Sequence, residues 1–224
     1  MQSTLHNMFE SITKQFRADR FILWCNSVAV LLFVALSLYV KLFDKGGQLV
    51  LLFEDPFLVE RAYIGTFSAM SDLLWCVTVT ICVCSFGLLN AIRPGQKVNQ
   101  FLLYSAIGTG ILLMDDAFRM HLILAKIGVP KLLIYLVYGI AALSYVFVFW
   151  RIIRGTPYIL LLLAAILFII SAVVDTTPLP GKGSIAMLED GTKLLGIINI
   201  LLYFRYVCWQ AVLQSINQLR HRAS

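Results

Sequence analysis

The stretch FILWCNSVAVLLFVALSLYVKLF, residues 21–43, contains a single charged residue, Lys41, and decides the class of fold. A helix of about 20 apolar residues crosses the roughly 30 Å of hydrocarbon in a bilayer, so this stretch is long enough to span one. Five more apolar runs follow it: Leu73 to Leu89, Phe101 to Met114, Leu132 to Trp150, Pro157 to Val174 and Ile185 to Phe204. The sequence therefore predicts an all-α integral membrane protein, a six-transmembrane-helix bundle.

The third apolar run reaches spanning length only if its helix continues through Asp115 and Asp116. That interpretation places two acids inside a membrane helix. Composition supports the membrane class, because 60% of the residues are hydrophobic and 13% are charged, against about 25% charged in soluble domains. A water-soluble protein is excluded.

The two ends of the chain have the pattern of helices that lie on a membrane surface. Phe9, Ile12 and Phe16 recur at helical spacing with basic residues between them, so residues 1–20 are predicted to form an N-terminal amphipathic interfacial helix. Residues 21–208 form the predicted transmembrane domain, and residues 209–224 a C-terminal cytoplasmic helical extension. In the longest loop, a short helix is predicted from Pro56 to Tyr63.

Lysine and arginine in short loops favour the cytoplasmic side of a membrane, and this rule orients the bundle. Nine of them fall on one face: Lys14, Arg17, Arg20, Arg93, Lys97, Arg151, Arg154, Arg220 and Arg222. We therefore predict that both termini are cytoplasmic. The net charge of +6 reflects this asymmetry and does not indicate a nucleic-acid partner. Membrane lipids are the expected partners, and a homo-oligomer or a larger membrane complex stays open.

Ionisable residues gather at the opposite, extracytoplasmic ends of four predicted spans. They are Asp72 in the second span, Asp115, Asp116, Arg119 and His121 in the third, Asp175 in the fifth, and Glu189, Asp190 and Lys193 in the sixth. Counting about 1.5 Å per residue from the basic ends puts Asp116 and Lys193 below the membrane boundary. Charges at that depth are costly, so they are expected to face the bundle interior and a partner.

Spacing along the helices suggests local partners within this set. Glu189 and Lys193 are four residues apart, as are Asp115 and Arg119, and residues at this spacing lie on one helical face. Even so, six carboxylates stand against two bases, an excess of four negative charges. A site of low dielectric requires that protons, a bound cation or contact with water balance this excess.

A metal site is one interpretation of these residues. Asp72, Asp116, His121, Asp175 and Glu189 form a mixed oxygen and nitrogen set that suits a divalent ion such as Zn, Mn or Fe. Asp115, Arg119, Asp190 and Lys193 then serve as ion pairs that balance its charge. The competing interpretation is structural, because ionisable residues near helix ends often reach water and acids favour the first turn of a helix.

Three functions follow, from different classes. The first is a membrane protein that binds a cation, a proton or a divalent metal, for transport or sensing. The second is a metal-dependent intramembrane enzyme that acts on a lipid headgroup. The third is an accessory subunit of a larger membrane complex, in which the charges pair between helices. We favour cation binding, because it needs only the excess of acids, whereas an enzyme also needs a nucleophile that the sequence does not identify.

Overall fold

The computed structural model describes residues 20–43, 51, 65–177 and 183–223. Seven helices and no strand lie within those ranges, which confirms the all-helical prediction. The helices are α2 (Arg20–Phe43), α4 (Thr66–Ile92), α5 (Lys97–Phe118), α6 (Met120–Lys126), α7 (Lys131–Arg154), α8 (Ile159–Thr176) and α9 (Gly183–Ala223). The predicted helix at Pro56 to Tyr63, and all of the predicted interfacial helix except Arg20, lie outside the described residues.

Five of the described helices are long and apolar enough to cross a membrane. They are Thr66–Ile92, Lys97–Phe118, Lys131–Arg154, Ile159–Thr176 and Leu188–Arg220. The first predicted span, α2, has a shorter apolar stretch, Phe21–Leu36. Membrane-spanning helices are thus present, and the six-span count stays a prediction.

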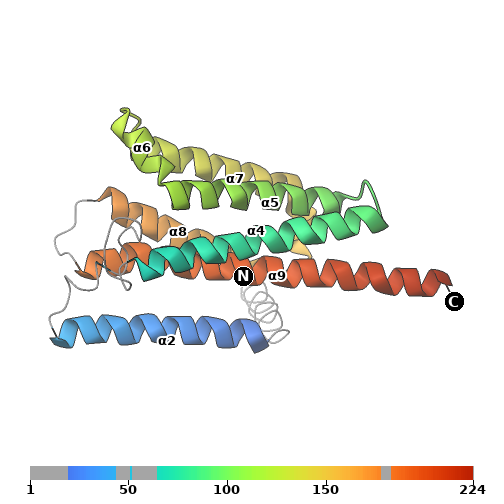
Figure 1. Cartoon of the computed structure of the whole chain (residues 1–224), viewed down its shortest axis with the longest axis horizontal. Coiled ribbons are helices and arrows are strands. Elements are labelled where there is room, and N and C mark those ends of the chain that lie inside the picture. Colours follow the sequence, from blue (N-terminus) through green and yellow to red (C-terminus); the bar gives the residue numbers. More distant parts are fainter. Residues whose placement is uncertain (1–19, 44–50, 52–64, 178–182, 224) are drawn as a thin grey trace, which may run out of the picture.

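The helices run side by side along the long axis of the molecule (Figure 1). The closest backbone packing joins α8 to α9, α4 to α5 and α4 to α9, so α4 and α9 form the centre of the bundle. Glycines allow two of the approaches to α9: a Cβ added at Gly196 would lie 3.1 Å from the Phe168 ring, and one at Gly191 3.2 Å from Phe33. Small residues at such crossings are typical of helix packing in membranes.

The two ends of the bundle differ in content. At one end, which we call the charged end, α4, α7 and α9 begin and α5 and α8 finish. This end carries the predicted cluster of ionisable residues: Asp72, Asp115, Asp116, Arg119, His121, Asp175, Glu189, Asp190 and Lys193. At the opposite, aromatic end, the Phe101 ring centroid lies 5.6 Å from Tyr145, 5.4 Å from Phe149 and 6.3 Å from Phe204. These rings belong to the main cluster of buried side chains, which joins α2, α4, α5, α7, α8 and α9.

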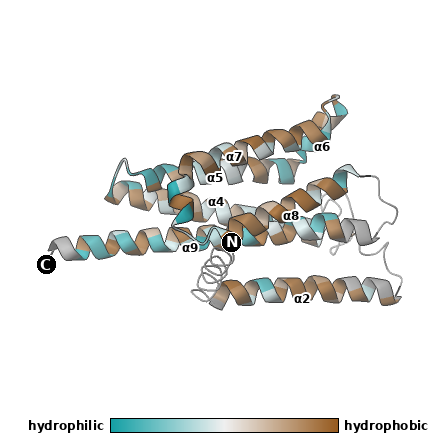
Figure 2. Cartoon of the chain, turned by 180° about the vertical axis from the view of Figure 1, so that it is seen from behind, coloured by the Kyte–Doolittle hydropathy of each residue, from teal (hydrophilic) through white to brown (hydrophobic). Residues whose placement is uncertain are grey.

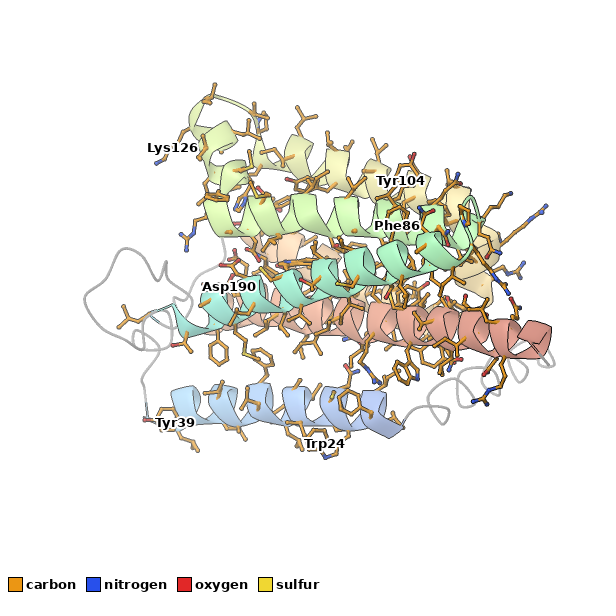
Figure 3. All side chains as sticks on the ribbon, turned by 45° about the vertical axis from the view of Figure 1, so that its right-hand side comes forward. Trp24, Tyr39, Phe86, Tyr104, Lys126 and Asp190 are labelled. Atoms are coloured by element: carbon orange, nitrogen blue, oxygen red, sulfur yellow. The ribbon has the colours of Figure 1, made fainter. Side chains whose placement is uncertain are left out.

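Many large hydrophobic side chains are exposed, and most of the ribbon in Figure 2 is coloured as hydrophobic. On α7, Phe147 is 80% exposed and Val148 is 74% exposed, and on α2 Trp24 points away from the other helices (Figure 3). Apolar side chains in such positions suit contact with lipid tails. The turns of α9 nearest the C-terminus extend past the neighbouring helices and alternate hydrophilic with hydrophobic residues (Figures 1 and 2).

Candidate functional site

A sharp turn at Arg119 builds the first part of the charged end. Its backbone is left-handed, with φ 49° and ψ 42°, and it is the only non-glycine residue with positive φ among the described ones. L-residues rarely adopt this conformation. The turn ends α5 at Phe118 and starts α6 at Met120.

This turn folds His121 back onto Asp115. The His121 backbone N–H donates to Asp115 Oδ1 at 2.7 Å, and the imidazole Nδ1 lies 3.2 Å from the same oxygen. Asp115 thereby satisfies one of the N–H groups that the start of α6 leaves without a helical partner. Arg119, predicted as a base for Asp115 on one helical face, lies just beyond the end of α5, and the pairing of these two residues stays a prediction. Arg119 lies within electrostatic range of Asp190.

A second group ties three helices together around Asp116. Lys193 of α9 forms an ion pair with Asp116 Oδ1, and Ser71 of α4 donates from its hydroxyl to Asp116 Oδ2 at 2.9 Å. Asp116 is 14% exposed and Ser71 is buried. Lys193 therefore pairs across the bundle with an acid of α5 rather than with Glu189 on its own helix.

The third group joins α7 to α8 through Asp175. Lys131 Nζ and the Tyr135 hydroxyl each donate to one carboxylate oxygen of Asp175, both at 2.7 Å. Lys131 opens α7 and Tyr135 lies one turn later, so the two donors share a helical face. Neither Lys131 nor Tyr135 was predicted to belong to the site. The sequence signal for them was two hydrogen-bond donors four residues apart at the start of an apolar run.

Glu189 and Asp190 are the two acids of α9 at this end. Neither forms a salt bridge within the part of the chain that the structure describes. Glu189 is half-buried and lies within electrostatic range of the carboxylates of Asp190 and Asp175 and of the Lys131 ammonium. Asp190 lies at the charged end where α9 starts (Figure 3), with the charges of Lys193, Asp116 and Arg119 nearby. Two carboxyl groups can share a hydrogen bond only if one of them holds a proton.

The five residues predicted as metal ligands are distributed over these separate groups. Asp116 pairs with Lys193, Asp175 with Lys131, and His121 with Asp115, while Glu189 lies beside Asp175. Asp72 is half-buried on α4, but the α4 side chain that binds Asp116 is its neighbour Ser71. Within the described ranges no three His, Cys, Asp or Glu side chains are grouped so that they could hold a metal ion.

The charged end holds more acidic than basic side chains. Six carboxylates (Asp72, Asp115, Asp116, Asp175, Glu189 and Asp190) stand against Lys131, Lys193 and Arg119. With a neutral His121, the acids of this set exceed its bases by three, one fewer than predicted, because Lys131 joins the set. Full ionisation of a half-buried group of this kind is unfavourable, so added protons or another cation would stabilise it.

Few polar side chains continue from the charged end into the bundle. Thr78 and Thr109 bond to carbonyls of their own helices, and Tyr203 shares a hydrogen bond with Thr156 at 2.9 Å. Asn199 is 1% exposed, and its Oδ1 atom has no hydrogen-bond partner in the described structure. These contacts describe separate polar positions, not a continuous path.

Residues 24–207 match the family described as Domain of unknown function (DUF8692), and the chain belongs to that family. The match covers α4, α5, α6, α7 and α8 completely, and parts of α2 and α9. No curated protein and no solved structure matches the chain.

Proposed function

We propose that this protein binds cations at the charged end, and that the cation is the proton. The observation that carries the proposal is the pairing of the acids. Asp115, Asp116 and Asp175 each contact a basic side chain, whereas Glu189 and Asp190 form no salt bridge among the described residues, and the carboxylates of Asp190 and Asp175 repel a charged Glu189. A proton held between Glu189 and Asp175 turns a repulsion between like charges into a hydrogen bond. In this proposal the acids of the charged end bind a cation, as predicted from the sequence, and the bound cation is a proton.

A divalent metal is the other cation of the predicted class. It would draw on Asp72, Asp116, His121, Asp175 and Glu189, and on Zn, Mn or Fe as the ion. The observed partners favour the proton, since a metal would have to displace Lys193 and Lys131 from their carboxylates before it could bind.

The proposed architecture is the six-span bundle with both termini cytoplasmic. The 24 residues of α2 correspond to about 36 Å of helix, enough to cross the hydrocarbon core. In this arrangement residues 21–208 form the membrane domain, residues 1–20 and 209–224 lie at the cytoplasmic surface, and the charged end faces the opposite side. The basic loops at the aromatic end support that orientation.

Whether bound protons are sensed or transported depends on access from the aromatic end. Sensing is the function we propose, because the polar side chains below the charged end form local bonds within or between helices. Transport would require water to join Asn199 to the groups on either side of it.

One contact supports an enzyme as a second candidate. The Ser71 hydroxyl donates to Asp116 at 2.9 Å, and Lys193 holds the other oxygen of that carboxylate. A serine bonded to a carboxylate that can accept its proton is a candidate nucleophile, the element that the sequence analysis lacked. Hydrolysis of a lipid headgroup that is abolished in Ser71→Ala, with proton binding intact, would support this candidate over the first.

The experiment is a titration of the purified full-length protein in lipid nanodiscs. Infrared difference spectra report the carbonyl stretch of a protonated carboxylic acid as the pH is lowered, and elemental analysis of the same sample reports bound metal. We expect a protonated carboxyl band in the native protein and its loss or shift in Glu189→Gln. The matched control is Thr192→Val, which removes a hydroxyl that bonds only to its own helix, at Leu188 and Glu189. An unchanged band in Glu189→Gln, or one metal ion per chain, would contradict the proposal.

A further inference from the structure

The described residues at the aromatic end include basic side chains and no acidic ones. The connection between α4 and α5 holds Arg93 and leads to Lys97, and the last turn of α7 holds Arg151 and Arg154. The acids of the described helices lie instead at the charged end. Within the part of the chain that the structure describes, these four basic side chains form no salt bridge. We call the four residues the basic face.

A contact between rings places the basic residues of α5 and α7 at one level. The two helices lie side by side (Figure 1), and the Phe101 and Phe149 ring centroids are 5.4 Å apart. Lys97 lies one helical turn before Phe101, at the start of α5. Arg151 and Arg154 follow Phe149 at the end of α7. Because the helices run in opposite directions, all three basic residues lie beyond the ring contact, on the side away from the charged end.

Arg154 is paired with a tryptophan at this level. Its Cζ atom lies 5.4 Å from the centroid of the Trp150 ring, which is 50% exposed. Tryptophan at the end of an apolar helix is typical of the headgroup level of a membrane. A guanidinium that stacks on a ring keeps the N–H donors at its edge, and their planar fork matches the oxygens of a phosphate. The pair therefore presents a phosphate-binding group at the height of lipid headgroups.

Buried side chains fix both connections that carry the basic face. Asn99 is 3% exposed, and its Nδ2 atom donates to the Arg93 carbonyl oxygen at 2.7 Å. After α7, the Thr156 hydroxyl donates to the Ile153 carbonyl oxygen at 2.7 Å and lies 2.9 Å from the hydroxyl of the buried Tyr203. Fixed backbone lowers the entropy cost of binding a ligand. Membrane orientation by positive charge does not require such fixed positions.

We propose that the basic face binds the phosphate groups of anionic phospholipids in the leaflet at the aromatic end. Four cations without acidic partners complement a negatively charged headgroup, whereas a zwitterionic headgroup has no net charge to offer. A lipid is favoured over a soluble phosphate compound, because the basic side chains stand at the ends of apolar helices whose exposed faces suit acyl chains. This inference goes beyond proton binding at the charged end, and neither proposal depends on the other.

Native mass spectrometry of the full-length protein counts the lipids that stay bound to each molecule. The protein in detergent is titrated with anionic phosphatidylglycerol and with phosphatidylcholine of the same acyl chains. At low salt we expect phosphatidylglycerol to bind about tenfold more tightly or better. Most of that preference should be lost at high salt, where exposed charges are screened. Equal binding of the two lipids would overturn the inference, because the basic side chains would then only orient the protein in the membrane.

Single charge removals test the position of the site. Arg154→Gln and Arg93→Gln, one on each connection, should each weaken phosphatidylglycerol binding by about fivefold, the effect of one basic residue at an anionic surface. The matched control is Lys126→Gln, which removes an exposed positive charge at the charged end and should leave binding unchanged. Native binding in both arginine variants, or an equal loss in the control, would overturn the assignment to the basic face.

A soluble competitor separates a lipid from a free phosphate ligand. Excess glycerol 3-phosphate carries the same phosphate without acyl chains, so it should not displace bound phosphatidylglycerol. Displacement would show that the basic face binds soluble phosphates and would overturn the proposed lipid. The carboxyl band at the charged end is measured in Arg154→Gln as well, and it should match that of the native protein. Absence of that band in both proteins would overturn proton binding and leave the lipid site standing.

Discussion

The same helices meet in two different ways at the two ends of this bundle. At the aromatic end α5, α7 and α9 meet through rings and aliphatic side chains, with Phe101 fully buried among Tyr145, Phe149 and Phe204. At the charged end they meet through carboxylates, with Asp116 and Asp175 as the points where the helices join. Outside the main cluster, the buried apolar contacts include a small group around Phe33 and Leu194 and the stacked rings of Trp75 and Phe168.

Packing and ion pairing differ in what they respond to. Contacts between rings depend on shape and persist over any pH at which the chain is folded. Ion pairs depend on the protonation of both partners, and each partner is costly to bury when the other is lost. The aromatic end therefore serves as the fixed part of the bundle, and the charged end as the part that can respond to its surroundings.

The largest effect should come from Lys193→Met. The substitution leaves the Asp116 carboxylate half-buried without its base, which typically costs about 3–5 kcal/mol of unfolding free energy. Reversible denaturation in mixed micelles measures the loss. The control is Lys126→Met, which replaces an exposed lysine at the end of α6. If both variants are equally stable, the ion pair does not join the charged end.

A somewhat smaller loss is expected from Phe101→Ala at the aromatic end. The side chain is fully buried and contacts three rings, so its removal leaves a cavity worth about 3 kcal/mol. Because packing of rings involves no titratable group, this loss should not change with pH. Phe147→Ala, on a residue that is 80% exposed on α7, should have little effect on the same measurement. A loss that follows pH in Phe101→Ala would break the contrast between the two ends.

Tyr135→Phe should have the smallest effect of the three. It removes one of two donors to Asp175 and leaves Lys131 in place, so the loss should be near 1 kcal/mol. Tyr104→Phe removes the hydroxyl of an exposed tyrosine and is the control. A loss as large as that of Lys193→Met would mean that Tyr135, and not Lys131, is the main link between α7 and α8.

The long helices were predictable from the sequence because each is a run of apolar residues. The predicted run at residues 21–43 corresponds to α2, and the third run does continue through Asp115 and Asp116, as α5 extends to Phe118. The ends were less well predicted: α4 begins at Thr66, several residues before the apolar run at Leu73. Polar residues such as Ser71 and Asp72 extend a helix without changing its apolar pattern.

The partners within the charged end were harder to predict, for a physical reason. Spacing along one helix identifies neighbours on that helix, which is why Glu189 was expected beside Lys193 and Arg119 beside Asp115. The partners formed depend instead on how helices rotate and cross, as with Lys193 and Asp116, and on one backbone turn at Arg119. Only the gathering of acids at one end of the bundle follows from the sequence alone, because alternating helix directions bring those ends together.

The unbroken length of α9 has a mechanical consequence. Its 41 residues correspond to about 60 Å of helix, twice the roughly 30 Å thickness of the hydrocarbon core. Lys193 lies near one end of this rod and Arg220 near the other. If α9 tilts as a rigid rod about its contacts with α4 and α8, a displacement of Lys193 relative to Asp116 moves Arg220 in the opposite direction, on the far side of the bundle.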